Sequence, residues 1–332
     1  MKKLLSFTIA LVMLLCLASV AMAQSPSGTV MLYSSLKESQ LAALKEAFQA
    51  KYPGIVMDYY QAGTGKIKTK IATEQQAGQV AADILWVGDS SDYLTFKEQG
   101  ILEAYVSPEA EAIDAAYKDP DNLYTGARLV VMGLAYNTNK VKAEDVPSKW
   151  TDLLEERFRD MIIMTDPTES GTTAYLVGAL VNNPKYGWDF FEKLAAMGTE
   201  LDSGTSGTHN NVASGGYMVC IAVDYVTQTL EGAGSPIKFV YPSEDTIAIS
   251  SPIALVRNSA NQENGKLLYD FILSKEGQDV LVANECTPIR DESTKAGALH
   301  ASEISKVALK PDEAKLAAEK LDTLDHFDQL FK

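Results

Sequence analysis

The chain has 332 residues, with 44 acidic and 29 basic side chains and a formal net charge of −15. A charge of that sign disfavours binding to nucleic acid and to anionic membranes. An anionic ligand must therefore be held by local geometry and not by general attraction. The length favours two domains over one.

The N-terminal segment has the pattern of a secretory signal peptide. Lys2 and Lys3 precede an apolar run from Leu4 to Val20, and Ala21-Met22-Ala23 fits the small-x-small cleavage rule. The run is short and lacks a stop-transfer pattern, which disfavours a retained membrane anchor. We expect cleavage before Gln24 and a mature protein outside the cytoplasm.

Strands and helices alternate in the first part of the mature chain. Apolar and β-branched runs predict strands over residues 28–33, 55–59 and 83–87. Helical spacing follows each strand and ends near residues 51, 76 and 99. This alternation predicts an open, largely parallel sheet with helices on both faces. Its ligand-facing turns lie at the carboxyl ends of the strands, at Ser34-Ser35, Gly63-Thr64 and Gly88-Asp89.

The same alternation restarts in the middle of the chain. We expect strands over residues 128–136, 161–164, 217–223, 239–241 and 246–256. We expect helices over residues 150–158, 188–196, 265–273 and 277–281, one from Ser170 onward, and one in the tail from residue 311.

These elements predict two lobes joined by two extended crossings. The chain leaves the first lobe near Val130 and returns near Ser250, so the crossings form a hinge and a ligand binds in the cleft between the lobes. The expected parts are a signal peptide at 1–23, a first lobe of 24–130 plus 250–332 with the C-terminal helices, and a second lobe of 131–249.

One segment has the pattern of an anion site. An apolar run ends at Asp166-Pro167, and Ser170-Gly171-Thr172-Thr173 then opens an apolar helical pattern. Backbone N–H groups without acceptors and the positive end of the helix dipole meet at such a helix start, which suits an anion. An ordinary N-cap explains the same residues, because Ser and Thr commonly cap their own helix.

The motifs of enzymes and metal sites are missing from the sequence. No Cys/His cluster has zinc spacing, and Gly204-Thr205-Ser206-Gly207 lacks the spacing of a nucleophile elbow. We expect no enzyme, no cofactor and no metal, with a secreted hydrolase as a distant alternative. Cys220 and Cys286 can pair in an oxidising compartment, but an apolar run surrounds Cys220 and a buried free thiol is the favoured reading.

Six segments carry a family resemblance. They are Val-Met-Leu-Tyr-Ser-Ser at 30–35, Ala-Asp-Ile-Leu-Trp at 82–86, Leu-Ala-Tyr-Asn at 134–137, Ser-Gly-Thr-Thr at 170–173, Ile-Ala-Val-Asp-Tyr at 221–225 and Leu-Tyr-Asp-Phe-Ile-Leu-Ser-Lys-Glu-Gly-Gln at 268–278. In this order the chain resembles a periplasmic substrate-binding protein of an ABC importer, in the ferric-iron-binding-protein-like branch.

The resemblance implies an α/β fold of two lobes, type II-like, each lobe a sheet flanked by helices, with a two-strand hinge. It implies capture of a small solute in the periplasm by a monomer and delivery to a cognate ABC permease in the inner membrane. It implies no chemistry on the solute.

The ligand class is predicted from the positions at which this chain differs from the iron-binding members of that branch. Iron-binding members place His, or Arg then His, after the first Tyr-Ser-Ser, and two adjacent tyrosines after the strand at 221–223. This chain has Leu36-Lys37 and Asp224-Tyr225 instead. Ferric iron prefers several hard anionic oxygens, so it becomes the alternative. The favoured ligand is a small phosphate- or phosphonate-bearing organic solute, such as a sugar phosphate or 2-aminoethylphosphonate.

Hydroxyls and backbone amides from both lobes are expected to hold this headgroup without a formal positive charge. His209 and Asn210 in a polar loop, and Asp224 with Tyr225, would contact the rest of the solute, although a solvated loop histidine and an N-cap carboxylate are competing readings. The turn at Thr64 also has a competing reading, as plain turn chemistry. The candidate ligand-binding residues are Ser34, Ser35, Thr64, Ser170, Gly171, Thr172, Thr173, His209, Asn210, Asp224 and Tyr225.

Overall fold

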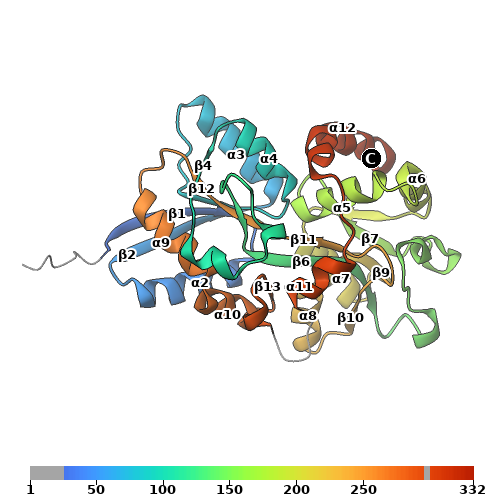
Figure 1. Cartoon of the computed structure of the whole chain (residues 1–332). Coiled ribbons are helices and arrows are strands. Elements are labelled where there is room, and N and C mark those ends of the chain that lie inside the picture. Colours follow the sequence, from blue (N-terminus) through green and yellow to red (C-terminus); the bar gives the residue numbers. More distant parts are fainter. Residues whose placement is uncertain (1–25, 295–299) are drawn as a thin grey trace, which may run out of the picture.

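The computed structural model describes residues 26–294 and 300–332. The expected signal peptide and its cleavage site lie outside the described residues. Two sheets lie side by side and helices cover both of them (Figure 1). In the two described ranges, no helix is long and apolar enough to cross a membrane. The two-lobe α/β architecture expected from the sequence is confirmed.

The first lobe is built on a six-stranded sheet with the order β2-β1-β3-β12-β4 and with β5 paired to β12. β1 is parallel to β2 and β3, as the alternation predicted, whereas β12 is antiparallel to β3. The strands are β1 Gly28–Ser34, β2 Ile55–Gln61, β3 Ile84–Trp86, β4 Leu102–Glu103, β5 Thr125–Gly126 and β12 Pro252–Val256. The helices are α2 Glu38–Lys51, α3 Thr64–Gln76, α4 Ser91–Glu98, α9 Gln262–Leu273 and α10 Lys275–Ala283.

The second lobe is built on a seven-stranded sheet with the order β10-β6-β9-β7-β8, in which β11 and β13 also pair with β6. Its strands are β6 Arg128–Asn137, β7 Ile162–Thr165, β8 Glu200–Asp202, β9 Val219–Val223, β10 Ile237–Val240, β11 Ile247–Ile249 and β13 Thr287–Pro288. Its helices are α5 Gly171–Val181, α6 Gly187–Ala196, α7 Thr205–Ala213 and α8 Asp224–Gly232, and the chain ends in α11 Ala301–Val307 and α12 Glu313–Phe331.

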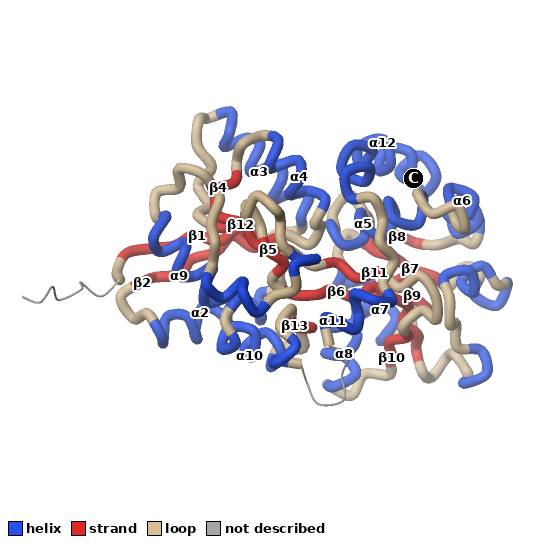
Figure 2. The backbone as a smooth tube through the Cα atoms, in the orientation of Figure 1, coloured by secondary structure: helices blue, strands red, loops and turns tan. Residues whose placement is uncertain are grey.

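β6 and the β11–β12 segment run between the two lobes (Figure 2). The side chains of β6 divide between the cores, because Leu129 and Val131 lie in the core of the first lobe while Val130 and Met132 lie in that of the second. α12, expected with the first lobe, packs against α5 and α6 of the second lobe and also contacts α4. The expected domain boundaries stay a prediction.

Two expected elements differ from the structure. Residues 150–158 form two 3-10 turns, Trp150–Leu154 and Glu156–Phe158, and no α-helix, because Glu155 between them has extended backbone angles. The polar segment around His209 and Asn210, expected as a loop, belongs to α7, which begins at Thr205. Thr208 and Val212 on one face of α7 are fully buried, so tertiary packing overrides the polar composition.

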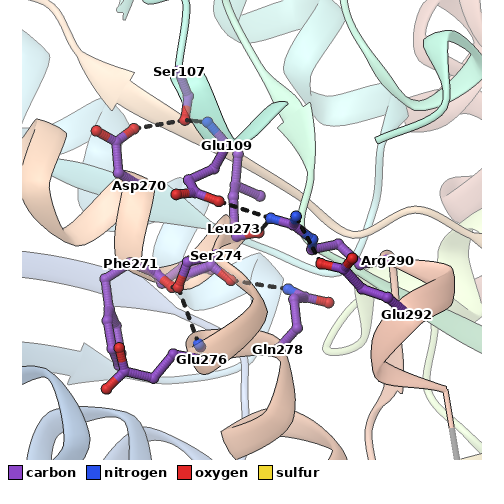
Figure 3. A network of polar contacts seen from close by, with 12 residues as sticks. Ser107, Glu109, Asp270, Phe271, Leu273, Ser274, Glu276, Gln278, Arg290 and Glu292 are labelled. Atoms are coloured by element: carbon purple, nitrogen blue, oxygen red, sulfur yellow. Dashed lines mark hydrogen bonds and ion pairs between the residues drawn. The ribbon is translucent and has the colours of Figure 1, made fainter. Parts of the chain in front are cut away.

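The segment 268–278, which carried much of the resemblance, has a structural role at the junction of α9 and α10 (Figure 3). Asp270 accepts a hydrogen bond from the Ser107 hydroxyl at 2.6 Å. Ser274 caps α10 by accepting from the Gly277 N–H at 3.2 Å. Buried Gln278 donates to the Ala127 carbonyl at 2.7 Å, next to the start of β6. This junction therefore fixes the base of the crossing strand.

Candidate functional site

A cavity of about 240 Å³ lies between the lobes and is lined from both of them. Five helices begin at its wall, because the N-cap residues of α2, α3, α5, α7 and α8 all line it. These N-caps are Lys37, Gly63, Ser170, Gly204 and Val223. The first N–H groups of each helix have no intrahelical acceptor, and each N-terminus carries partial positive charge. The backbone N–H groups at these five helix starts therefore make the cavity suitable for an anion.

Arg128 adds a formal positive charge that is buried beside the cavity. Its side chain is part of the lining, yet the residue is only 2% exposed. Among the described residues no carboxylate lies within ion-pair distance of it, and its Nε has no hydrogen-bond partner. Nη1 makes two long contacts of 3.5 Å, to Gln40 Oε1 and Cys286 Sγ. A buried cation without a counter-charge is costly, and an anionic ligand would neutralise it.

Lys37 is a second cation of the lining, half-buried at the start of α2. Its Nζ lies 5.3 Å from the centre of the Tyr225 ring. Burial, with a smaller contribution from the positive charge of Arg128, lowers the pKa of Lys37 to about 8. An anion bound in the cavity would reverse this shift, because it favours the charged form of the amine. The prediction from the sequence required no formal positive charge, whereas the described wall carries three cationic side chains, because Lys66 lines it as well.

The two lobes contact each other at one rim of the cavity. A Cβ atom added to Gly63 would lie 2.5 Å from the carbonyl oxygen of Glu169, and one added to Gly65 would overlap the carbonyl oxygen of Thr168. Lys66 Nζ lies 3.5 Å from Glu169 Oε2 across the same contact. The missing side chains of two glycines thus let the start of α3 approach the β7–α5 turn, and the lobes are closed on each other.

Six of the candidate residues lie on the cavity wall. They are Ser35, Thr64, Ser170, Gly171, Thr172 and Tyr225. At the start of α5 the Ser170 hydroxyl lies 3.0 Å from that of Thr172 and accepts from the Thr173 N–H at 3.3 Å. Ser170 is therefore an N-cap and a wall residue at once, so the two readings of this segment are compatible.

His209 is not on the wall. It is fully buried in α7, where Nε2 accepts from the Val223 N–H at 3.0 Å. Nδ1 lies 2.7 Å from the Thr205 carbonyl oxygen, so it carries the ring hydrogen and donates it. Burial lowers the pKa of His209 to about 4, which keeps the ring neutral. Both nitrogens are committed to the backbone, and neither a ligand contact nor a solvated loop position fits.

Asp224 is also withdrawn from the cavity. Its carboxylate is fully buried and accepts from the Val131 N–H at 3.3 Å and the Thr287 hydroxyl at 2.9 Å. Burial raises its pKa to about 6. These contacts tie α8 to β6 and β13.

The remaining three candidates lie off the wall as well. The Ser34 hydroxyl is buried and accepts from the Leu36 N–H at 3.1 Å. The buried Thr173 hydroxyl donates to that of Ser170 at 3.1 Å. Asn210 is exposed on α7.

Sequence reasoning missed several wall residues. Besides Lys37 and Arg128 they are Gln61, Ala62, Lys66, Glu169, Ser203, Gly204, Thr205, Ser206 and Val223. Arg128 gave one usable signal, because it stands at the head of an otherwise apolar strand, where a charge has to be explained. The start of α7 gave none, since its polar sequence reads as a loop.

The cavity has few ligands for a metal ion. Among the described residues of its wall, Glu169 is the one carboxylate and Tyr225 the one phenol. In the part of the chain that the structure describes, no group of three or more His, Cys, Asp or Glu side chains is arranged to hold a metal ion.

Comparison with known proteins identifies the family. Residues 81–315 match the model of the bacterial extracellular solute-binding proteins. A putative 2-aminoethylphosphonate-binding periplasmic protein of Salmonella typhimurium is 26% identical over 281 residues, which is 80% of each chain.

Solved structures share the fold. The periplasmic binding protein AfuA of Actinobacillus pleuropneumoniae, with fructose 6-phosphate bound, is 24% identical with a TM-score of 0.81, over 92% of this chain and 99% of that one. Iron-bound HitA of Pseudomonas aeruginosa is 20% identical with a TM-score of 0.79, over 91% and 99%. The chain belongs to the bacterial extracellular solute-binding proteins.

Proposed function

We propose that this protein is the periplasmic solute-binding component of an ABC importer and captures a small phosphate- or phosphonate-bearing organic solute between its lobes. The observation that carries the proposal is the meeting of Arg128 and Lys37 with five helix N-termini in one cavity. The solute would then pass to a cognate permease in the inner membrane.

The chemistry of the wall favours a dianionic headgroup. A phosphoryl group carries between one and two negative charges at neutral pH and three acceptor oxygens. The wall offers three cations, of which Lys66 is paired with Glu169, together with the hydroxyls of Ser35, Thr64 and Thr172 and backbone N–H groups at each helix start. A headgroup with several oxygens can accept from both lobes at once, and it would thereby hold them closed.

The relatives support this ligand class. The Salmonella relative is named for 2-aminoethylphosphonate, and the AfuA structure contains fructose 6-phosphate. Glu169 and the hydroxyls of Ser203, Thr205 and Ser206 are wall groups that can accept hydrogen bonds from an amine or from sugar hydroxyls.

Ferric iron is the weaker candidate, although HitA, which shares the fold, contains iron. A trivalent cation at this wall would face three positive side chains, with one carboxylate and one phenol among the described lining residues to hold it. Iron prefers several anionic oxygens, which this wall does not supply.

A ligand screen tests the proposal directly. Mature protein is mixed with fructose 6-phosphate, 2-aminoethylphosphonate, inorganic phosphate or ferric citrate, and the melting temperature is followed. A ligand that binds only the folded state raises the melting temperature. At a free ligand concentration of 100 times Kd, the free energy of unfolding increases by about 2.7 kcal/mol. Isothermal titration then gives Kd for each compound that shifts the melting temperature.

The competing assignments give distinct results. A rise with ferric citrate and a visible charge-transfer colour would replace the phosphate assignment by iron. Turnover of a phosphate ester by the purified protein would reject a pure binding function. No rise with any phosphate or phosphonate compound would reject this ligand class.

A further inference from the structure

The C-terminal helix α12 is attached to the second lobe by apolar packing. Phe327 is fully buried, with its ring centre 5.9 Å from that of Phe191 on α6. Leu316 packs over Gly178 of α5, where an added Cβ would lie 3.0 Å from Leu316 Cδ2. Figure 1 shows the helix lying over α5 and beside α6. These contacts make α12 part of the body of the second lobe.

From this attachment two polar side chains of α12 contact the first lobe. Lys320 Nζ lies 2.5 Å from Asp89 Oδ2 and 2.6 Å from Asp92 Oδ1. Glu313 Oε1 accepts from the Ser90 hydroxyl at 2.7 Å. Asp89 and Ser90 lie in the turn between β3 and α4, and Asp92 lies in the first turn of α4.

The ion pairs of Lys320 are shielded from solvent. Its side chain is 12% exposed, and those of Asp89 and Asp92 are 1% and 0% exposed. Asp92 has a second cation in its own lobe, because Lys68 of α3 lies 2.6 Å away. Asp89 otherwise receives hydrogen bonds from Ser91, and among the described residues Lys320 is its one ion-pair partner. Separation of the lobes removes that partner.

The same turn borders the ligand cavity. Gly88, which precedes Asp89, lines the cavity. A Cβ added to Gly88 would lie 3.1 Å from Thr172 Cγ2, and one added to Gly171 would lie 3.1 Å from Asp89 Cβ. The carboxylates that Lys320 binds, those of Asp89 and Asp92, therefore lie next to the contact between the β3–α4 turn and the start of α5.

We infer that Lys320 is a positioning residue of the binding cleft. From the second lobe it holds the Gly88–Ser90 turn of the first lobe against the N-terminus of α5, and the bound solute is released when this contact breaks. The inference rests on the proposed function for its ligand, and it adds that the C-terminal helix controls how long the solute is retained.

The test compares Lys320→Met with Lys315→Met. Lys315 lies on the same helix and its ion pair, with Glu319 at 3.8 Å, stays within that helix. Both variants lose one charge, but only the first loses a contact between the lobes. Stopped-flow fluorescence with fructose 6-phosphate and with 2-aminoethylphosphonate gives the association and dissociation rates for each variant.

For Lys320→Met we expect the dissociation rate to rise by about tenfold with little change in the association rate, because contacts made only in the closed state act on release. Lys315→Met should match the parent protein in both rates. A merely structural role would lower the melting temperature and the active fraction but leave the dissociation rate unchanged, and that result would overturn the inference. If Lys320→Met does not fold, Ser90→Ala is used in its place, because it removes the hydrogen bond from Ser90 to Glu313 between the lobes. A faster dissociation rate in Ser90→Ala would support the inference, and an unchanged dissociation rate would overturn it.

Failure of the inference and of the proposed function can be told apart. If the parent protein binds neither compound, the proposed function fails. The role of Lys320 in holding the lobes together can still be tested by small-angle scattering of the unliganded proteins. A larger radius of gyration for Lys320→Met than for Lys315→Met would support its role in holding the lobes together. Equal radii would count against it.

Discussion

The guanidinium carbon of Arg128 lies 4.8 Å from the centre of the Tyr225 ring, so an aromatic face takes the place of a carboxylate beside this buried cation. Arg128 opens β6 and Tyr225 lies in the first turn of α8. An aromatic ring attracts the cation without cancelling its charge. The positive field of Arg128 is therefore available to a ligand in the cavity.

Replacing Arg128 by Met should weaken ligand binding without lowering stability. A hydrogen bond to a charged group contributes roughly 1.5–3 kcal/mol, which corresponds to a rise in Kd of about 10- to 150-fold. The substitution leaves no carboxylate unpaired and removes the cost of burying a charge, so the free energy of unfolding should stay the same or rise.

Calorimetry and urea unfolding measure the two effects of Arg128→Met separately. The matched control is Arg257→Met, since Arg257 is half exposed and lies 3.7 Å from Glu103, away from the cavity. Loss of stability with unchanged affinity would show that Arg128 has a packing role and no ligand role.

Binding should weaken as the pH rises above about 8, because the amine of Lys37 then loses its proton in the free protein. An anion favours the protonated amine, so binding above that pH takes up a proton and the affinity falls by up to about tenfold per pH unit. Fructose 6-phosphate is the suitable probe, because its phosphate is already ionised in this range.

Lys37→Met is the control for this pH dependence. The variant should bind more weakly at pH 7 and should lose the fall in affinity between pH 8 and 9.5, measured by calorimetry. An identical pH profile in the variant would assign the proton to another group.

The two threonines at the start of α5 should separate binding from stability. Thr172 lies on the cavity wall, whereas the Thr173 hydroxyl is buried against that of Ser170. Thr172→Val should raise Kd by the loss of one hydrogen bond to a charged group, roughly 1.5–3 kcal/mol. Thr173→Val should lower stability by about 1 kcal/mol, because it removes the buried hydrogen bond from the Thr173 hydroxyl to that of Ser170, with a smaller effect on Kd.

The separation is read from calorimetry together with urea unfolding of each single variant. Equal losses of affinity in the two variants would contradict the assignment of the ligand contact to Thr172 and of the stabilising hydrogen bond to Thr173.

Local patterns predicted the longer strands and most of the helices of both lobes, because their apolar runs and helical spacing are continuous in sequence, but they missed α7 and the short strands β4, β5, β8 and β13. The wall of the cavity depends on which turns meet, and that is a property of the folded chain. Ser170 and Thr172 could be predicted because one helix start contains its own caps and amides. The charge of Arg128 at the head of an apolar strand was a signal, but neither its place on the wall nor that of Lys37 could be predicted, because both depend on the lobes meeting at Tyr225.

His209 shows the opposite failure. A histidine in a polar stretch reads as a ligand contact or a solvated loop residue, and its burial depends on the packing of α7 against β9. Asp224 was placed beside the ligand because it takes the position of the first of the two tyrosines in iron-binding members, yet it is fully buried among β6, β13 and its own helix. Neither arrangement is encoded within a few residues of the side chain itself.

A side chain at Gly63 or Gly65 should prevent closure without harming the fold of either lobe. An added Cβ would meet the backbone of Glu169 or Thr168 in the other lobe, where no flexible side chain can move aside. Gly63→Ala and Gly65→Ala should therefore raise Kd and enlarge the radius of gyration of the liganded protein. Gly232→Ala is the control, because nothing lies within 4 Å of its added Cβ. Closure and affinity equal to those of the control would contradict this steric argument.

The burial of neutral His209 should make stability fall as the pH drops from about 6.5 to about 4. Its pKa is about 4 in the folded protein and about 6.5 in an unfolded chain, so the unfolded state binds more protons in that window. The free energy of unfolding then decreases with falling pH, by roughly 3 kcal/mol over the whole window.

Asp224 acts with the opposite sign in part of the same window. Its folded pKa of about 6 lies above its ordinary value, so the folded state binds more protons there and gains stability as the pH falls. The raw pH profile of the parent protein therefore mixes the two groups. His209→Gln can keep both backbone hydrogen bonds but has no titrating ring, so the difference between the parent protein and this variant isolates His209. Urea unfolding at pH 7, 6, 5 and 4 should show that difference shrinking as the pH falls, whereas parallel curves would mean that His209 is not buried as a neutral ring.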